Sequence, residues 1–206
     1  MKKKCKRNVG RPHFPFPPVF IVTGACCVGK TAIIPDLRKL LPEFDIIDGD
    51  SFFALGDKYG WSIHRNTLLQ IASEICKNNR SPIICSAVFI DDFDTCSARS
   101  SLRYIYFLNL HCSDDIRKTR LVYRLKRKGW EQNKINDFIS ENNKMAIELH
   151  NTISDTLEVS AKSIAEAAKD VASWIKINLP MHLTGVLRRY SFLAHRRATA
   201  VKCIGR

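Results

Sequence analysis

Apolar and polar residues alternate in blocks along the central part of the chain. Short runs that contain apolar or β-branched residues predict strands at 19–23, 45–48, 82–87, 104–110 and, more briefly, 151–154. Apolar residues that recur at helical spacing predict helices at 29–41, 64–78, 114–128, 131–149 and 160–177. Strands that alternate with helices form a parallel sheet with helices on both faces. The pattern therefore predicts an α/β fold with a five-stranded parallel sheet.

Two of these helices carry a local signal of their own. Ser160 is a residue type that caps helix N-termini, so we expect it to begin the last helix. Pro35 lies inside the first helix, where it removes one amide donor and crowds the carbonyl of Thr31. We expect a bend at Pro35 and a helix that continues past it.

The two ends of the chain differ from its centre. Residues 1–18 are basic and then rich in proline, which predicts an extended arm without a core of its own. The centre, residues 19–178, has the pattern of one domain. In the tail, residues 179–206, apolar residues keep helical spacing beside pairs of arginines, so a basic amphipathic helix and a solvated tail are both open. Contact of the ends with nucleic acid or an anionic membrane surface is a further alternative.

The net charge of +13 belongs to these ends. Six of the 33 Lys and Arg residues lie in residues 1–17 and six in residues 181–206, and neither segment contains an acid. The middle of the chain has 21 basic and 20 acidic residues, which does not indicate a nucleic-acid-binding domain. The eight cysteines show no CxxC spacing, which favours reduced thiols in the cytoplasm over disulfides or zinc.

Residues 19–31, VFIVTGACCVGKT, contain the most specific motif of the chain. A glycine, four residues and then Gly-Lys-Thr match the phosphate-binding pattern GxxxxGK[ST]. Small residues let successive backbone amides turn toward one phosphate, and the following helix points its positive end at the same anion. Lys30 would reach the β and γ phosphates, and the Thr31 hydroxyl would bind Mg²⁺. The predicted nucleotide-binding residues are Gly24, Ala25, Cys26, Cys27, Val28, Gly29, Lys30 and Thr31.

An export signal with a lipid-attachment cysteine is a second interpretation of this stretch, because lysines precede it and Cys26 follows two small residues. Such a signal needs an uninterrupted apolar region of about 7 to 15 residues. Here prolines interrupt the segment between the lysines and residue 19, and the unbroken apolar run VFIV has only four residues. The export signal also leaves the Gly-Lys-Thr ending unexplained, so the phosphate loop is favoured.

Two carboxylates follow the second predicted strand. Asp48 and Asp50 are two positions apart, so both can project from the carboxyl end of that strand toward the phosphate loop. One could hold Mg²⁺ through water, with Thr31 and Asp50 as the predicted metal residues, and the other could accept a proton from a substrate hydroxyl. A polar turn around Gly49 is the structural alternative.

Arginines recur along the helix predicted at 114–128. Spaced three or four residues apart, they would form one cationic edge made of Arg117, Arg120, Arg124 and Arg127. This edge could clamp a transferring phosphoryl group, or it could be a solvated basic face. Gly129-Trp130 separates this helix from the next, and such a joint suits a small lid.

Two further groups of side chains are candidates for function. The thiols of Cys26 and Cys27 could be activated by the positive potential of the loop, which would make nucleotide binding sensitive to oxidation. Otherwise they are simply small enough for the loop.

In residues 51–66, aromatic rings could stack on a base or cover a sugar, or they could pack between helix and sheet. The candidates in this acceptor wall are Asp57, Tyr59, Trp61, His64 and Arg65.

The segments GACCVGKT, IIDGD, ICSA and YIYFLNL and the Arg-rich helix together resemble the small P-loop kinases, which include gluconokinase, shikimate kinase and the nucleoside monophosphate kinases. The resemblance spans about residues 19–178. TGACCVGKT, IIPDLRKLLPEFDIIDGD and RLKRKGW are more similar still to bacterial proteins labelled AAA-family ATPase or nucleoside-kinase-like. The resemblance implies a three-layer α/β sandwich of the P-loop NTPase fold, with ATP and Mg²⁺ at the loop and a short helical lid.

The resemblance also implies roles for single residues. Lys30 and Thr31 would hold phosphate and metal, and Asp48 or Asp50 would face the acceptor. The phosphates would be covered by Arg120, Arg124 or Arg127. The histidine and proline that follow the paired aspartates in gluconokinases are replaced here by FFALGDKYGWSIHRN, so the resemblance does not identify the acceptor.

We therefore expect a cytoplasmic ATP-dependent phosphotransferase, a monomer or dimer, that acts on a nucleoside, nucleotide or sugar acid. A P-loop ATPase or nucleotide-dependent switch that contacts nucleic acid through the basic ends is the alternative. Against it, the third strand lacks an apolar run that ends in an acid. An interaction protein whose phosphate loop no longer supports catalysis is a third possibility, and the intact Lys30 and Thr31 argue against it.

Overall fold

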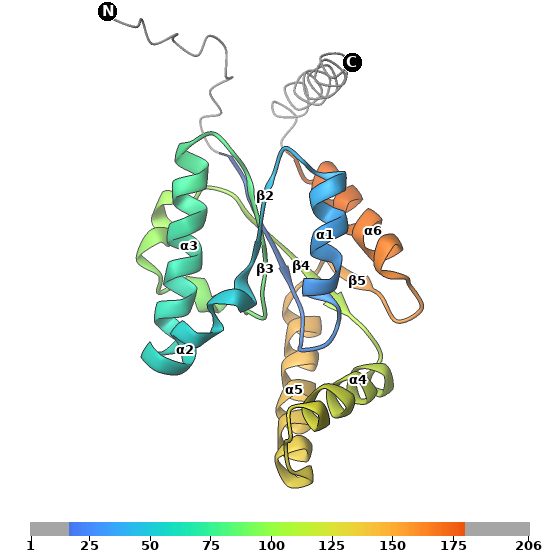
Figure 1. Ribbon diagram of the computed structural model, residues 1–206. Helices are drawn as coiled ribbons and strands as arrows, with labels where there is room; N and C mark the ends of the chain where they lie inside the picture. The colour runs from blue at the N-terminus through green and yellow to red at the C-terminus, as the bar shows by residue number, and fades with distance from the viewer. Residues whose placement is uncertain (1–16, 180–206) are drawn as a thin grey trace, which may run out of the picture.

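The computed structural model describes residues 17–179 of the chain. Its sheet has five parallel strands in the order β2-β3-β1-β4-β5. The strands are β1 (Val19–Thr23), β2 (Asp45–Asp48), β3 (Pro82–Cys85), β4 (Ile105–His111) and β5 (Thr156–Glu158). Strand β1 lies at the centre, paired with β3 on one side and β4 on the other (Figure 1). The predicted five-stranded parallel sheet is confirmed.

Helices cover both faces of this sheet (Figure 1). Helices α1 (Lys30–Leu40) and α6 (Ile164–Ile177) pack together on one face, and α3 (Trp61–Lys77) covers the other. The remaining helices are α2 (Phe53–Tyr59), α4 (Asp114–Arg127) and α5 (Gln132–Thr152). Short 3₁₀ turns lie in the connections at η1 (Gly49–Phe52), η2 (Asp91–Phe93) and η3 (Ser97–Ser101). The arrangement is the three-layer sandwich that was predicted.

Alternate residues of β1 face the two layers of the core. Phe20 and Val22 are fully buried against α1 and α6, while Val19 and Ile21 are fully buried on the α3 side. Successive strand residues point to opposite faces, so a strand that is apolar at every position is covered on both sides. This buried strand fixes the point from which the glycine-rich loop leaves the sheet.

The fifth strand and the start of the last helix differ from the prediction. The strand expected at 151–154 is wrong, because α5 continues to Thr152 and β5 begins only at Thr156. The cap expected at Ser160 is also wrong, because α6 is capped by Ser163. The Ser163 hydroxyl accepts a hydrogen bond from the Glu166 amide, and the Glu166 carboxylate accepts one from the Ser163 amide. This reciprocal capping box satisfies two backbone amides where a lone serine satisfies one.

The first three helices match the predicted pattern in part. Helix α1 continues through Pro35, as expected. Helix α3 begins at Trp61, three residues before the predicted start at 64. It is preceded by α2, which has only seven residues and is too short to show a helical period in the sequence.

Helices α4 and α5 form a hairpin that extends from the carboxyl end of the sheet (Figure 1). Gly129 between them has φ +75°, a left-handed conformation that glycine adopts without strain. The hairpin has a small core of its own, made of Leu121, Leu125, Ile135 and Ile139. Cys26 and Cys27 of the glycine-rich loop pack against this core. The predicted lid is therefore a helical hairpin that contacts the loop.

The predictions for the basic arm and the basic tail fall on residues 1–16 and 180–206, which lie outside the described part of the chain. Within residues 17–179, no helix combines the length and the apolar character needed to cross a membrane. The candidate site is built from the described residues alone.

Candidate active site

The loop between β1 and α1 has two glycines that the backbone requires. Gly24, directly after β1, has φ +147°, and a Cβ there would lie 2.5 Å from the carbonyl oxygen of Leu110 in β4. A side chain at this position would collide with the neighbouring strand. Gly29, at the N-cap of α1, has φ +113°. The two glycines let the chain turn sharply from β1 into α1, whose first turn carries a partial positive charge.

Lys30 folds back over the loop. Its side chain is buried, and its ammonium group donates hydrogen bonds to the carbonyl oxygens of Gly24 at 2.7 Å and Ala25 at 3.0 Å. A buried ammonium group needs such partners, because an unpaired charge away from water is costly. Phosphate oxygens are stronger partners for an ammonium group than carbonyls, so they can replace the two carbonyls when a nucleotide binds.

A cavity of about 460 Å³ opens beside the loop. It is lined by residues 26–33, by Asp50, Arg120 and Arg124, and by Val159, Lys162, Ser163, Ile164 and Ala167. The structure therefore brings most of the predicted site residues to one place, although they come from three separate parts of the chain. Gly24 and Ala25 are buried in the turn behind the loop. Asp48 and Arg127 do not line this cavity.

Asp48 and Asp50 lie on a tight turn at the carboxyl end of β2. The Asp48 carboxylate accepts a hydrogen bond from the Asp50 amide at 3.2 Å and so caps the 3₁₀ turn η1. The hydroxyl of Ser86, just after β3, lies 3.4 Å from the Asp50 carboxylate and donates to it. A Cβ on Gly49 would lie 2.6 Å from the Cβ of Ser86, so only glycine fits between the two strand ends. The turn directs Asp50 to the cavity.

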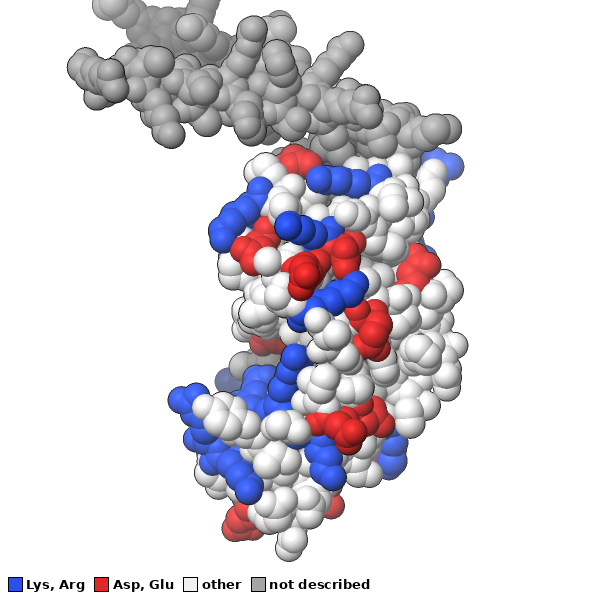
Figure 2. All heavy atoms as spheres, turned by 90° about the vertical axis from the view of Figure 1, so that its right-hand side faces the viewer, with Lys and Arg blue, Asp and Glu red and all other residues white. Residues whose placement is uncertain are grey.

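The arginines of α4 divide into three environments. Arg120 donates to the carbonyl oxygen of Cys27 at 3.3 Å, and Arg124 lies 4.0 Å from the Cys27 sulfur, so both reach the loop. The guanidinium of Arg127 lies 5.7 Å from the centre of the Tyr123 ring. Lys and Arg side chains gather over the lower part of the face where α4 lies (Figure 2). Only part of the predicted cationic edge therefore faces the cavity.

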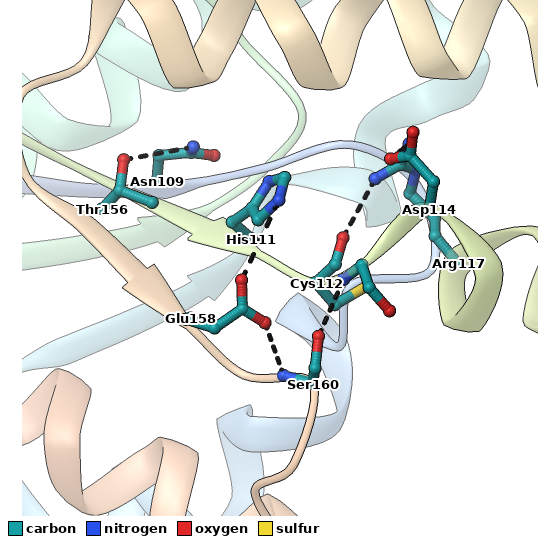
Figure 3. A network of polar contacts seen from close by, with 9 residues as sticks. Asn109, His111, Cys112, Asp114, Arg117, Thr156, Glu158 and Ser160 are labelled. Carbon is teal, nitrogen blue, oxygen red and sulfur yellow. Dashed lines mark hydrogen bonds and ion pairs between the residues drawn. The ribbon is translucent and has the colours of Figure 1, made fainter.

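The prediction that Arg117 belongs to this exposed edge is wrong, because its side chain is fully buried. It donates to the carbonyl oxygen of Cys112 at 3.1 Å, to Asp114 at 2.6 Å and to Asn143 at 2.7 Å. These partners belong to the end of β4, to α4 and to α5. Through Asn143, Arg117 anchors the base of the hairpin that carries Arg120 and Arg124. Figure 3 shows Arg117 beside Asp114 and Cys112.

A second set of contacts joins the ends of β4 and β5 (Figure 3). The Ser160 hydroxyl accepts a hydrogen bond from the Ser113 amide at 2.7 Å, and the Ser160 amide donates to Glu158 at 2.8 Å. His111 lies 3.9 Å from the Glu158 carboxylate. Burial acts to raise the pKa of Glu158, but hydrogen bonds from Ser160 and the neighbouring His111 lower it overall. The network holds the start of α4 against the β5–α6 connection, and this connection borders the cavity, as do Arg120 and Arg124 farther along α4.

The two cysteines of the loop are held by the hairpin. The backbone amide of Cys26 donates to the side-chain oxygen of Asn142 in α5 at 2.7 Å. Burial raises the pKa of the Cys26 thiol, and Lys30 offsets only part of this effect. Of the two alternatives for Cys26, this favours a small side chain that the loop accommodates over an activated thiolate, since a raised pKa leaves less thiolate at neutral pH.

The predicted acceptor wall divides into buried and exposed parts. His64 is buried, and Arg65 forms an ion pair with Asp92 at 2.9 Å. Tyr59 and Trp61 are exposed. Asp57, on α2, is exposed as well. The Trp61 ring still packs against Phe53 and His64, so packing accounts for part of it, whereas Tyr59 is more open to solvent.

Several residues of the site have no signal in the sequence. The β5–α6 connection supplies Val159, Lys162 and Ser163 to the cavity, and α5 supplies Asn142 to the loop. Only the tertiary fold brings these residues to the loop, and no local motif marks them as part of a binding site. Ser163 and Glu166 do match a capping-box pattern, but that pattern indicates the start of a helix.

The oxygen ligands at the loop suit a magnesium ion. The Thr31 hydroxyl and the Asp50 carboxylate border the same cavity, and Mg²⁺ prefers such hard oxygen donors together with phosphate oxygens. Among residues 17–179, no cluster of three or more His, Cys, Asp or Glu side chains is arranged to hold a metal. A metal bound here would therefore share its ligands with a nucleotide.

A central strand followed by a Gly-Lys-Thr loop, in a parallel sheet with a helical hairpin over that loop, defines the fold of the small P-loop kinases. By sequence, no protein-family profile and no curated protein matches the chain. Solved structures match it in fold. A gluconokinase from Sinorhizobium meliloti has a TM-score of 0.55 at 16% identity, over 85% of this chain and 98% of its own.

Two further matches agree with this one. A sugar kinase from Janibacter sp. has a TM-score of 0.55 at 15% identity, over 79% of this chain and 96% of its own. A shikimate kinase from Bacteroides thetaiotaomicron has a TM-score of 0.54 at 15% identity, over 77% of this chain and 98% of its own. At these identities the likeness shows the shared fold, and these three neighbours are kinases.

Proposed function

We propose that the protein is an ATP-dependent phosphotransferase that moves the γ-phosphoryl group of ATP to a small-molecule acceptor. The observation that carries this proposal is the single cavity shared by the phosphate loop, Asp50 and two arginines. A phosphate loop alone supports nucleotide binding. A carboxylate and two guanidinium groups at the same cavity add what phosphoryl transfer requires, namely positioning of an acceptor and stabilisation of charge.

We place the nucleotide in this cavity. Its phosphates would meet the backbone amides of the loop and the ammonium group of Lys30. Its base would lie against the apolar side chains of the β5–α6 side, Val159, Ile164 and Ala167. When bound, ATP supplies the phosphoryl group, and Mg²⁺ held at Thr31 and Asp50 neutralises phosphate charge.

We assign separate roles to the two carboxylates and to the arginines. Asp50 is exposed and borders the cavity, so it contacts the metal or accepts the proton of the acceptor hydroxyl. Asp48 supports Asp50 through its hydrogen bond to the Asp50 amide. Arg120 and Arg124 cover the phosphates. Arg127 lies beside Tyr123, so we assign it at most a long-range electrostatic effect.

The acceptor would bind between Asp50 and residues 51–66. Arg65 is paired with Asp92, whereas the exposed Lys58 lies beside the Tyr59 ring and keeps its charge. An acceptor with a ring, such as a nucleoside or a nucleotide, fits the exposed aromatic rings of this wall. We further propose a reducing compartment, the cytoplasm, since the thiols of Cys85 and Cys112 are packed as small apolar groups.

The test is an acceptor screen with ATP and Mg²⁺ against nucleosides, nucleoside monophosphates and sugar acids. We expect ADP formation that depends on the acceptor. Lys30→Ala should abolish nucleotide binding, and Asp50→Asn should lower turnover by about 10²- to 10⁴-fold while nucleotide binding is kept. ATP hydrolysis that needs no acceptor and is unaffected by Asp50→Asn would instead support an ATPase or switch. DNA affinity that depends steeply on salt and requires residues 181–206 would favour a role with nucleic acid.

A further inference from the structure

His64 of α3 contacts the turn that carries the carboxylates of Asp48 and Asp50. Its side chain is 3% exposed, and its Nε2 atom lies 3.1 Å from the carbonyl oxygen of Gly49. A carbonyl oxygen can only accept a hydrogen bond, so Nε2 must carry the proton and donate it. This contact joins the acceptor wall to the Asp48-Gly49-Asp50 turn.

The rest of the His64 ring has no polar partner. Its Nδ1 atom is buried, and no described residue hydrogen-bonds to it. Trp61 packs its ring edge-on against the imidazole, with ring centres 5.6 Å apart. An unpaired buried nitrogen is costly, and an apolar side chain would fill the same space without that cost. The hydrogen bond to the turn is therefore the one polar contact that favours histidine here.

The other side-chain hydrogen bonds that hold the turn use the carboxylates themselves. Asp48 accepts the Asp50 amide through one of its carboxylate oxygens, and the Ser86 hydroxyl occupies a carboxylate oxygen of Asp50 at a long 3.4 Å. Both contacts compete with a metal ion or an acceptor hydroxyl for those oxygens. The contact of His64 uses only the backbone carbonyl of Gly49. It can therefore persist when both carboxylates engage their ligands.

We propose that His64 is a positioning residue, which holds the Gly49 carbonyl and so fixes Asp50 at the edge of the cavity during the reaction. The inference rests on the proposed phosphotransferase function. It predicts that loss of the hydrogen bond lowers turnover without weakening nucleotide binding, because the phosphate loop is not touched by His64. A misplaced catalytic group commonly costs about 10²-fold in rate.

Three substitutions test the proposal. In His64→Gln the side-chain amide reaches as far as Nε2 and can still donate to Gly49. In His64→Asn the same amide is too short for that contact, and in His64→Leu no donor remains. We expect kcat to fall by about 10- to 100-fold in the Asn and Leu variants and to stay within about 3-fold of wild type in Gln. The dissociation constant for ATP with Mg²⁺ should change less than about 2-fold in all three.

A second measurement does not depend on activity. Amide hydrogen exchange of residues 48–53, measured without nucleotide, should become faster in the Asn and Leu variants and keep the wild-type rate in Gln. Thermal stability should be followed for all three variants. Unchanged exchange in Leu, or equal loss of kcat in all three variants, would overturn the proposal. If the exchange pattern holds but wild type transfers phosphate to no acceptor, then the phosphotransferase function fails and the positioning of the turn stands.

Discussion

The side-chain oxygen of Asn142 in α5 accepts a hydrogen bond from the backbone amide of Cys26 at 2.7 Å, across 116 positions of sequence. Asn142 is buried, and its Nδ2 atom has no partner among the described residues. The hydrogen bond ties the third residue of the phosphate loop to the second helix of the hairpin. The shape of the loop therefore depends on the position of the hairpin.

We expect Asn142→Leu to lower the free energy of unfolding by about 1–3 kcal/mol, because it leaves the Cys26 amide without an acceptor. The same change should weaken nucleotide binding, since the loop loses its attachment to α5. Chemical denaturation and titration with ATP measure the two effects. Asn136→Ala is the matched control, because Asn136 lies on the exposed side of α5 and its loss should cost less than about 0.5 kcal/mol. Equal losses in the two variants would contradict the expectation.

Cys27 has φ +66°, a left-handed backbone that non-glycine residues adopt at a cost. Cys27→Gly should therefore be more stable than Cys27→Ala by about 1 kcal/mol, since both variants lose the thiol contacts and only glycine relieves the strain. Cys26 does not have a positive φ, so the order should reverse there, with Cys26→Ala the more stable variant. Thermal unfolding of the four variants compares Gly with Ala at each position. The same order of stability at both positions would contradict backbone strain at Cys27.

The arginines of α4 should separate by function. Arg120→Ala and Arg124→Ala remove guanidinium groups that reach the loop, so each should lower phosphoryl transfer by about 10²-fold. Arg127→Ala, with its side chain beside Tyr123, should change the rate by less than about 3-fold. Steady-state kinetics with a saturating acceptor compares them. A loss at Arg127 as large as that at Arg120 would show that the whole cationic edge acts on the phosphates.

Arg117→Leu should lower the free energy of unfolding by about 1–3 kcal/mol, because the Cys112 carbonyl and the Asn143 side chain lose their donor at the base of the hairpin. Lys118→Leu, on the exposed side of the same helix, is the control and should stay within about 0.5 kcal/mol of wild type. Urea unfolding measures both. A small effect at Arg117 would mean that this anchor does not hold the hairpin.

Reactivity of the Cys26 thiol should depend on pH in a direction set by its burial. Burial raises its pKa above the usual 9.0, and the thiolate is the nucleophile, so alkylation by iodoacetamide should be slow at pH 7 and should still increase beyond pH 9.0. Mass spectrometry of the loop peptide at a series of pH values follows the reaction at this residue. A rate that is already at its plateau near neutral pH would contradict the burial seen here.

The fold was predictable where burial imposes an unambiguous pattern. Residues 19–23 and 45–48 form strands with the predicted bounds, because each is short, has apolar residues at its centre and is paired within the sheet. Strand β5 was misplaced because it has only three residues at the sheet edge, and its polar sequence Thr-Leu-Glu carries no strand signal. Its position is set by pairing with β4, which is a tertiary contact that a local pattern cannot contain.

The site was predictable only in its local motifs. The glycine-rich loop, Asp50 and the arginines could be found because each belongs to a short pattern with a chemical reason. Arg117 and Arg120 share the same helical spacing, yet one is buried and the other reaches the loop. What separates them is Asn143 and the Cys112 carbonyl, which come from other elements. The spacing of the arginines predicts which side of the helix they share. Their contacts with other elements determine which of them is buried and which reaches the loop.

Before any nucleotide arrives, the ammonium group of Lys30 is already satisfied by the carbonyls of Gly24 and Ala25. Binding is therefore an exchange of partners, and an anion must outcompete two neutral oxygens before it gains anything from this lysine. A lone sulfate or phosphate ion would gain only the contacts with this lysine, the loop amides and the start of α1. A triphosphate with its metal and base would gain further contacts along the cavity, so the exchange would favour it over the small anions of the cell.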